Sequence, residues 1–178
     1  DSAVFSSALD AARAADSRNG WAVTPKTAEE LGGHEMVLAA NGSAGAAIAA
    51  DGDIQAVFRN AKTGVKGSME AIMPRAIELG GDKLDCYGEG LVRVYENYGF
   101  VPVARVEFNE EYANPGWDSS KGTPDIYFMV HNGDSAETVA ANIGQYEHMA
   151  TDQLHALPIY GKDGYDEAMA YRDSLLAQ

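Results

Sequence analysis

The sequence has a single cysteine, Cys86, and no apolar run approaching the roughly 18 residues that cross a membrane. One cysteine can form neither an internal disulfide nor a multi-cysteine zinc site, and the four histidines show no metal-ligand spacing. We therefore predict a protein without a metal that works in a reducing, cytoplasmic compartment and stays outside membranes. Cys86 follows Leu84 and Asp85 in a predicted strand, which favours a buried structural thiol over a nucleophile.

Positive charge is also scarce. The 178 residues contain 13 Lys and Arg against 27 Asp and Glu, which gives a formal net charge of −14. Phosphate backbones repel such a chain, so we expect no direct binding of nucleic acid. The acidity is compatible with a cationic amine substrate or a basic protein surface as partner, and equally with a role in solubility alone. Hydrophobic residues make up 46% of the chain, which is enough for the core of one domain.

The first third of the chain predicts helices followed by an antiparallel meander. Apolar residues at helical spacing indicate a first helix, and a capping box from Thr27 to Glu30 indicates a second. Two tight-turn signals, Asn41-Gly42 and Asp51-Gly52, separate three short apolar segments and predict hairpins between them. The ranges are helices at 4–12 and 24–31 and strands at 36–40, 44–50 and 54–58.

The remainder alternates strands and helices. Pro74 lies inside an otherwise helical segment, and we expect the helix to start near it or to bend there because proline removes a backbone hydrogen bond. The predicted ranges are helix 69–79, strand 84–87, helix 91–98, strand 100–108, a polar loop at 110–123, strand 126–130 and helices 135–154 and 166–176.

This order predicts an α+β or mixed α/β fold with a central, mostly antiparallel twisted sheet flanked by helices. We assign the domain to residues 1–133 and a helical C-terminal extension, packed on the same domain, to residues 134–178.

The segment from Gly80 to Phe108 is the most specific part of the sequence. It combines a strand, a short helix that ends at Gly99 and a second strand, and Tyr95 lies four residues before Gly99-Phe100. This arrangement resembles the C-terminal half of the Gcn5-related N-acetyltransferase (GNAT) fold, in which a Tyr-x-x-x-Gly-Phe segment closes over the thiol end of acetyl-CoA. The resemblance covers residues 36–131 and implies acetyl-CoA as a co-substrate. It also implies that Tyr95 protonates the leaving thiolate.

The spacing of Tyr95 allows a second interpretation. Leu91, Val94, Tyr95 and Tyr98 recur at helical spacing, and a tyrosine in such a pattern often belongs to the core. Both interpretations stay open at this level.

The loop after the third predicted strand occupies the place of the family's pyrophosphate loop. It reads Lys-Thr-Gly-Val-Lys-Gly-Ser, and its two lysines could neutralise phosphate charge. The family's Gln/Arg-x-x-Gly-x-Gly/Ala pattern is broken in either register, so a plain surface turn is the alternative. Gly88, seven residues before Tyr95, stands where the family often has an asparagine that contacts the cofactor. The residues that the resemblance assigns to cofactor binding are Val57, Phe58, Lys62, Gly64, Lys66, Gly67 and Ser68.

The general base is less well defined by the pattern. Glu107 is our candidate catalytic partner of Tyr95, since an alternating strand places it on one face with Arg105. Glu110, Glu35, Asp53 and His131 are further candidates, although lone acidic residues in such a chain mostly lie on the solvated surface. In the long polar loop, Trp117 and Tyr112 are candidates for an acceptor contact or for pinning the loop.

Two functions follow from these features. The first is an acyl-CoA-dependent N-acyltransferase that acts by direct attack of an amine, either of a small molecule or of a protein lysine. The second is a catalytically degenerate, GNAT-like interaction module that binds a host protein. Domains that resemble this one also occur in multidomain proteins of phages and mobile elements, and the broken loop pattern and Pro74 favour that alternative.

Overall fold

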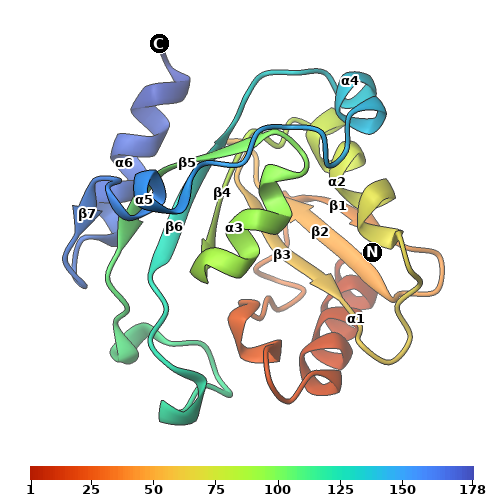
Figure 1. Ribbon diagram of the computed structural model, residues 1–178. Helices are drawn as coiled ribbons and strands as arrows, with labels where there is room; N and C mark the ends of the chain where they lie inside the picture. Colours follow the sequence, from red (N-terminus) through yellow and green to blue (C-terminus); the bar gives the residue numbers. More distant parts are fainter.

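The computed structural model describes all 178 residues and shows a mixed α/β architecture with two sheets flanked by helices (Figure 1). The sheets have the strand orders β1-β2-β3 and β4-β6-β5-β7. In chain order the elements are α1 (Ser2–Ala15), η1 (Gly20–Ala22), β1 (Glu35–Leu38), β2 (Ala44–Ile48), β3 (Ile54–Arg59), α2 (Ser68–Glu78), β4 (Lys83–Tyr87), α3 (Gly88–Glu96), β5 (Phe100–Val106), η2 (Glu110–Tyr112), η3 (Ser119–Lys121), β6 (Ile126–His131), α4 (Ala136–Ala141), α5 (Thr151–His155), β7 (Ile159–Tyr160) and α6 (Tyr165–Leu176).

The three-stranded sheet is the predicted antiparallel meander. Both predicted turns form, and in each of them a glycine N–H reaches back to a carbonyl: Gly42 to Ala39 at 2.8 Å and Gly52 to Ala49 at 2.9 Å. The two glycines have φ values of +73° and +94°, which a residue with a Cβ seldom adopts. The local turn chemistry therefore fixes this part of the topology.

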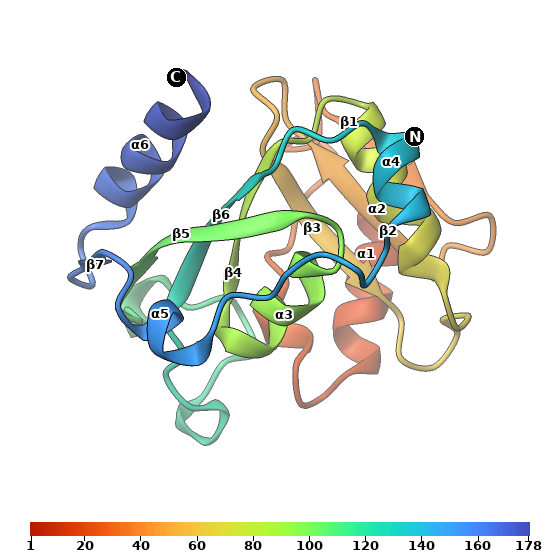
Figure 2. The ribbon, with the colours of Figure 1, turned by 45° about the horizontal axis from the view of Figure 1, so that its top comes forward.

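The four-stranded sheet is antiparallel except at its edge. β6 pairs antiparallel with β4 on one side and with β5 on the other, whereas β7 pairs parallel with β5. β7 is only two residues long and was not predicted from the sequence. Because β7 and α6 contact β5, the C-terminal residues pack against the body of the fold (Figure 2).

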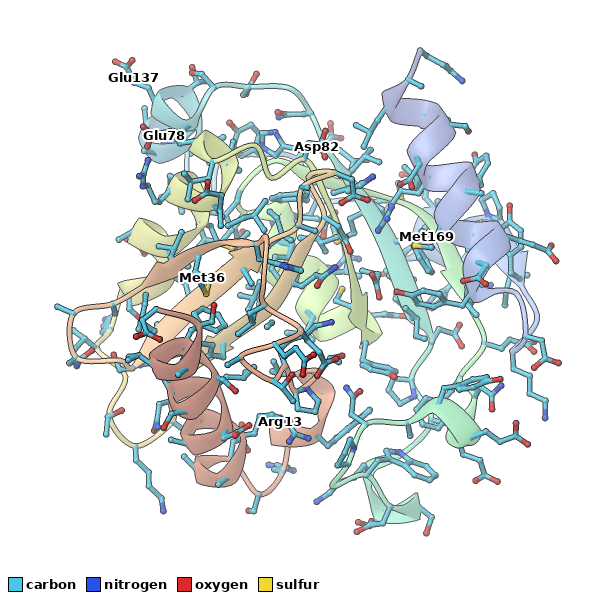
Figure 3. The ribbon with its side chains drawn as sticks, turned by 180° about the vertical axis from the view of Figure 1, so that it is seen from behind. Arg13, Met36, Glu78, Asp82, Glu137 and Met169 are labelled. Carbon is cyan, nitrogen blue, oxygen red and sulfur yellow. The ribbon has the colours of Figure 1, made fainter.

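Helices cover both faces of the sheets. α2 and α3 lie on one face, here called the front, and share a large core with Leu84, Tyr127 and Met129. On the rear face, α1 packs on the three-stranded sheet through Phe5 and Leu9, and α6 packs on β5 and β6 through a separate small cluster. Figure 3, which shows the molecule from behind, places α1 and α6 over different sheets.

Several predicted boundaries are wrong. The predicted helix at 24–31 is only a turn, although the Thr27 and Glu30 capping box forms with two reciprocal hydrogen bonds of 3.1 Å. Gly32 and Gly33 follow at once and the chain enters β1, so the cap has no helix to stabilise. The predicted helix at 69–79, in contrast, forms as α2 (Ser68–Glu78). It begins six residues before Pro74 and not near it, and the proline is buried inside the helix.

The predicted helix at 135–154 is also wrong, because the chain forms α4 and α5 with an irregular segment at 142–150 between them. That segment is fastened to α3. The buried carboxylate of Glu96 accepts a hydrogen bond from the backbone N–H of Met149 at 2.7 Å, and Arg93 donates to the carbonyl of Met149 at 2.6 Å. These tertiary contacts outweigh the helical propensity of the segment.

Candidate functional site

The two sheets meet at a single point and then separate. One parallel bridge, between Asp53 and Lys83, joins β3 to β4, and beyond it no backbone hydrogen bond links the two strands. β3 also carries a β-bulge, at which Ala56 has a φ of +51° and the register with β2 shifts. Because of this extra residue, Ile54 and Val57 both pack against the front core although they are three residues apart. The result is a V-shaped gap that widens toward Arg59.

A cavity of about 220 Å³, the central cavity, lies at this gap and is lined by residues from both faces of the sheets. Its front half is apolar apart from the phenol of Tyr95 and the thiol of Cys86, and its rear half carries carboxylates and a second tyrosine. The lining residues are Ala22, Val23, Thr24, Lys26, Asp53, Ile54, Gln55, Ala56, Val57, Leu84, Asp85, Cys86, Leu91, Tyr95 and Tyr165. The polar side chains of the central cavity therefore lie at its two ends.

Tyr95 of α3 is 7% exposed and lines this cavity. Its ring packs edge-on against Phe100, with centroids 6.3 Å apart, and no hydrogen bond joins its hydroxyl to a protein group. Burial raises the pKa of the phenol far above its usual value, so the group keeps its proton at physiological pH. Tyr95 thus combines a core position with a hydroxyl that is available as a hydrogen-bond donor.

A second cavity, the wide-end cavity of about 480 Å³, lies where the V is broadest. It shares Tyr95, Leu91 and Val57 with the central cavity and extends to Arg59 at the end of β3 and Met69 in the first turn of α2. Phe58 lines it as well, while its ring packs against Phe5 in the rear core. The two cavities together connect the start of α2 with Tyr95.

The loop between β3 and α2 is closed by Asn60. The Oδ1 atom of this buried residue accepts hydrogen bonds from the N–H groups of Lys62 and Thr63, at 2.9 and 3.2 Å. The N–H of Gly64 bonds to the Asn60 carbonyl at 2.7 Å, and a Cβ on Gly64 would lie 2.5 Å from that oxygen. Gly64 is therefore required by the tight turn, and these three N–H groups are engaged within the protein.

The second half of the same loop retains free donors. The N–H groups of Val65, Lys66 and Gly67 form no hydrogen bond within the protein, and no side chain caps α2. Gly67 precedes the helix with a φ of +82°, and the Oγ atom of Ser68 is buried without a partner. An uncapped helix start with free N–H groups and nearby lysines favours an anion. The structure thus brings Lys66, Gly67 and Ser68 together at the N-terminus of α2, with Lys62 exposed on the loop.

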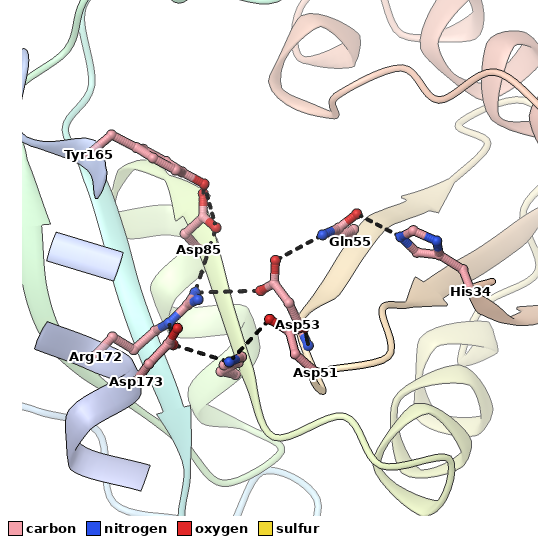
Figure 4. A network of polar contacts seen from close by, with 9 residues as sticks. His34, Asp51, Asp53, Gln55, Asp85, Tyr165, Arg172 and Asp173 are labelled. Carbon is pink, nitrogen blue, oxygen red and sulfur yellow. Dashed lines mark hydrogen bonds and ion pairs between the residues drawn. The ribbon is translucent and has the colours of Figure 1, made fainter. Parts of the chain in front are cut away.

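Behind the sheets, the central cavity ends in a network of buried charges (Figure 4). Arg172 of α6, whose side chain is 1% exposed, lies between the carboxylates of Asp53 and Asp85, with its Nη1 atom 3.4 and 3.8 Å from them. Its Nε atom donates to Asp173 at 3.0 Å, and Lys83 contacts the same carboxylate at 3.2 Å. A buried cation is thus surrounded by acids from three separate elements.

Asp53 and Asp85 both border the central cavity, which Tyr165 also lines. The hydroxyl of Tyr165 lies 3.1 Å from each carboxylate oxygen of Asp85 and donates to this carboxylate. Burial and the neighbouring carboxylate of Asp53 raise the pKa of Asp85 to about 6, although Arg172 opposes the shift. Burial raises the pKa of Asp53 as well, with the Gln55 amide acting in the opposite direction.

The raised pKa of Asp85 predicts a pH-dependent stability. The native state binds a proton below pH 6, whereas in the unfolded chain the carboxyl ionises near a pKa of about 3.9, so stability falls as the pH rises through this window. Between pH 5 and pH 7.5, we expect Asp85 to lower the free energy of unfolding of the unmodified protein by roughly 1 to 1.5 kcal/mol. This decrease should be absent in Asp85→Asn. Urea unfolding of both proteins at the two pH values measures this effect. If the difference in free energy of unfolding between the two proteins were the same at both pH values, the prediction would be wrong.

The other acid-base candidates lie apart from Tyr95. Glu107 is exposed beyond the end of β5, and it lines neither the central nor the wide-end cavity but a rear cavity of about 550 Å³. His131 is buried, and both of its ring nitrogens are engaged: Nε2 donates to the carbonyl of Tyr98 at 2.9 Å and Nδ1 accepts from the N–H of Gly133. Glu35 and Glu110 are exposed outside all three cavities. Of the predicted acids, only Asp53 reaches the central cavity.

The long polar loop forms a wall of the site. The ring of Trp117 packs against that of Phe108 with centroids 5.0 Å apart, and its indole N–H donates to the carbonyl of Gly122, so Trp117 pins the loop. Asn114 ties the same loop to the N-terminal segment through the Trp21 carbonyl at 3.0 Å. Tyr112 is 74% exposed and borders the rear cavity.

Sequence reasoning missed the residues at the rear of the cavity. Asp85, Tyr165 and Arg172 were not among the candidates, and Gly88 has a backbone explanation because it joins β4 to α3 with a φ of +83°. The sequence feature that could have identified Asp85 is its position between two apolar strand residues, Leu84 and Cys86.

Comparisons with known proteins identify no relative. No family model matches the chain, and neither a curated protein nor a solved structure matches it. None of the helices has the length and apolar character needed to cross a membrane. The side chains of His, Cys, Asp and Glu form no group of three or more that could hold a metal ion.

Proposed function

We propose that this protein is an acyl-CoA-dependent N-acyltransferase that transfers an acyl group directly to an amine. The observation that carries the proposal is the passage from the uncapped start of α2, along β3, to the unpartnered hydroxyl of Tyr95 and on through the sheets. A long ligand with an anionic part and a reactive end matches such a passage. The strand order and the divergence of β3 from β4 are compatible with a GNAT-like fold and support the same function.

Each part of the passage has a role in this proposal. The free N–H groups of the loop, with Lys62, Lys66 and Arg59, bind the pyrophosphate, since backbone donors at a helix start favour anions. The edge of β3 at Val57, which has no partner strand on the side of β4, supplies backbone groups to the pantetheine arm. Tyr95 keeps its proton in the apolar part of the cavity and delivers it to the leaving sulfur.

Binding of acetyl-CoA is the direct test. In isothermal titration calorimetry we expect one acetyl-CoA site per chain. At a hundredfold excess of ligand over Kd, binding should raise the free energy of unfolding by about 2 to 3 kcal/mol. Because the loop cations are exposed, replacing Arg59 and Lys66 together with alanine should weaken binding by roughly five- to thirtyfold. The control is Arg18→Ala, which removes an exposed cation outside the cavities and should leave the affinity unchanged.

Absence of binding would overturn the proposal. It would favour a non-catalytic, GNAT-like module that binds another protein, an alternative supported by the use of Asn60 to engage three N–H groups of the loop. An affinity that does not respond to loss of the two cations would place the anionic part of the ligand elsewhere.

A further inference from the structure

The front half of the central cavity, here called the front chamber, is an apolar space that carries only two polar groups, a phenol and a thiol. All of its side chains belong to the large front core or pack against it. The chamber is lined by Ile54 and Val57 of β3, Leu84 and Cys86 of β4, and Leu91 and Tyr95 of α3. None of these side chains is charged, so the chamber suits an uncharged, apolar group.

The front chamber is continuous with the wide-end cavity. Three of its six residues line both spaces, whereas Ile54, Leu84 and Cys86 line the central cavity but not the wide-end cavity. Ile54 and Leu84 directly follow the two residues of the bridge at which β3 and β4 join. The joined strands therefore bound the chamber at the apex of the V, and the chamber opens past Tyr95 into the wide-end cavity.

Tyr95 gives an independent reason to expect a ligand in the chamber. The residue is only 7% exposed and lines the chamber, and no hydrogen bond joins its hydroxyl to a protein group. Buried polar groups are nearly always hydrogen-bonded, so an unpaired donor that faces a cavity indicates a site for a ligand or a bound water. Because burial raises the pKa of the phenol, the hydroxyl stays a donor, and its matching partner is an acceptor such as a carbonyl or thioester group.

The size of the space sets the length of an apolar group that fits. The central cavity has a volume of about 220 Å³, and an apolar void of about 150 Å³ holds a molecule of benzene. The chamber therefore has room for a chain of roughly four to six carbons, and an acetyl group would leave much of it without contacts. A much longer chain would reach the carboxylates of Asp53 and Asp85 behind the sheets, where burial against hydrocarbon is costly (Figure 4).

We propose that the front chamber binds the acyl chain of the donor, and that the preferred donor carries a straight chain of roughly four to six carbons in place of acetyl. The proposal rests on the N-acyltransferase function and specifies the donor. The thioester group lies at Tyr95, and the chain runs along β4 toward Leu84. Cys86 lies two residues, or about 7 Å, further from the apex than Leu84 and therefore beside the path of the chain. The size of the side chain at position 86 thus determines which chain fits.

Isothermal titration calorimetry with acetyl-CoA, hexanoyl-CoA and decanoyl-CoA tests the chain length. Each methylene group removed from water contributes about fourfold in affinity, so hexanoyl-CoA should bind at least about tenfold more tightly than acetyl-CoA. Decanoyl-CoA should bind more weakly than hexanoyl-CoA, because a bounded chamber does not take the longer chain. Equal affinities for the acetyl and hexanoyl esters, or an affinity that keeps rising through decanoyl-CoA, would overturn the proposal.

Two substitutions at one position change the chamber in opposite directions. Cys86→Leu fills part of it and should weaken hexanoyl-CoA about tenfold or more, while the affinity for acetyl-CoA changes less than about threefold. Cys86→Ala enlarges the chamber and is the matched control, which should retain the preference for the longer chain. Binding of acetyl-CoA shows that each variant is folded. A loss that is equal for both esters in Cys86→Leu would contradict the assignment of Cys86 to the acyl chain.

The thiol of Cys86 gives a second measurement on the unmodified protein. Because it is the only cysteine, mass spectrometry can follow its reaction with methyl methanethiosulfonate. Burial raises the pKa of the thiol, so the reaction needs alkaline pH. N-methylhexanamide has the chain and a carbonyl but no CoA, and at a tenfold excess over its Kd it should slow the reaction roughly tenfold. N-methylacetamide at the same concentration should slow it less than about twofold.

The outcomes of these measurements separate the chamber from the acyltransferase function. If N-methylhexanamide protects Cys86 and no CoA ester binds, the acyltransferase function fails and the chamber stands as a site for a short-chain carbonyl compound. If acetyl-CoA binds but N-methylhexanamide gives no protection, the chamber fails alone. A thiol that does not react even in the unliganded protein would also overturn the proposal, because small molecules would then be unable to enter the chamber.

Discussion

Arg172→Met is expected to lower the free energy of unfolding by about 3 to 5 kcal/mol at pH 7.5. The guanidinium is 1% exposed and lies within 3.8 Å of Asp53, Asp85 and Asp173. Its removal leaves two largely buried carboxylates without their cation, and methionine fills the volume without replacing the charge. Guanidinium chloride unfolding of the variant and the unmodified protein measures the loss.

Two comparisons identify the cause of that loss. If uncompensated charge is responsible, the triple variant Asp53→Asn, Asp85→Asn and Arg172→Met should regain most of the stability. Arg75→Met is the matched control, because Arg75 pairs with Glu78 on α2 at 3.0 Å but is 50% exposed, and it should change stability by less than about 1 kcal/mol. An unchanged stability of Arg172→Met, or a triple variant no more stable than it, would show that the network is not energetically coupled.

The parts of the fold that sequence predicts well are those that short-range chemistry decides. The meander follows from two glycine turns, and the α3 segment follows from an amphipathic pattern that ends at Gly99. Where local and tertiary preferences disagree, the prediction is wrong. The capping box at Thr27 forms but leads into two glycines, and the segment at 142–150 is held against α3 by Glu96 and Arg93 instead of continuing as a helix.

The candidate site likewise has one part that the sequence predicts and one part that it does not. Tyr95 and the loop from Lys62 to Ser68 belong to recognisable local patterns. Tyr95 lines both the central and the wide-end cavity, whereas the loop lines neither and lies between Arg59 and Met69, which line the wide-end cavity. The rear network could not be predicted, since Arg172 meets Asp53 across 119 residues and Tyr165 meets Asp85 across 80. Only the topology that lays α6 over β6 and β5 brings these side chains together. Glu107 was predicted beside Tyr95, but the strand carries it to the rear cavity.

The second large effect is expected for Tyr95→Phe, which should reduce kcat for acyl transfer by about 100-fold or more. The phenol lies at the front of the central cavity, and burial keeps it protonated, so it can serve as the acid for a leaving thiolate. Its hydroxyl makes no hydrogen bond to the protein, and phenylalanine retains the ring contact with Phe100. We therefore expect the affinity for acetyl-CoA to change less than twofold and the stability by less than about 1 kcal/mol.

Tyr98→Phe provides the matched control for this measurement. Tyr98 is 5% exposed and follows the same helix, but it lines neither the central nor the wide-end cavity, so loss of its hydroxyl should leave kcat unchanged. Steady-state assays of thiol release with hexylamine as acceptor, together with thermal unfolding, distinguish the two tyrosines. If Tyr95→Phe lowers turnover, affinity and melting temperature together, the side chain acts as part of the core, because a proton donor in the transition state would affect kcat alone.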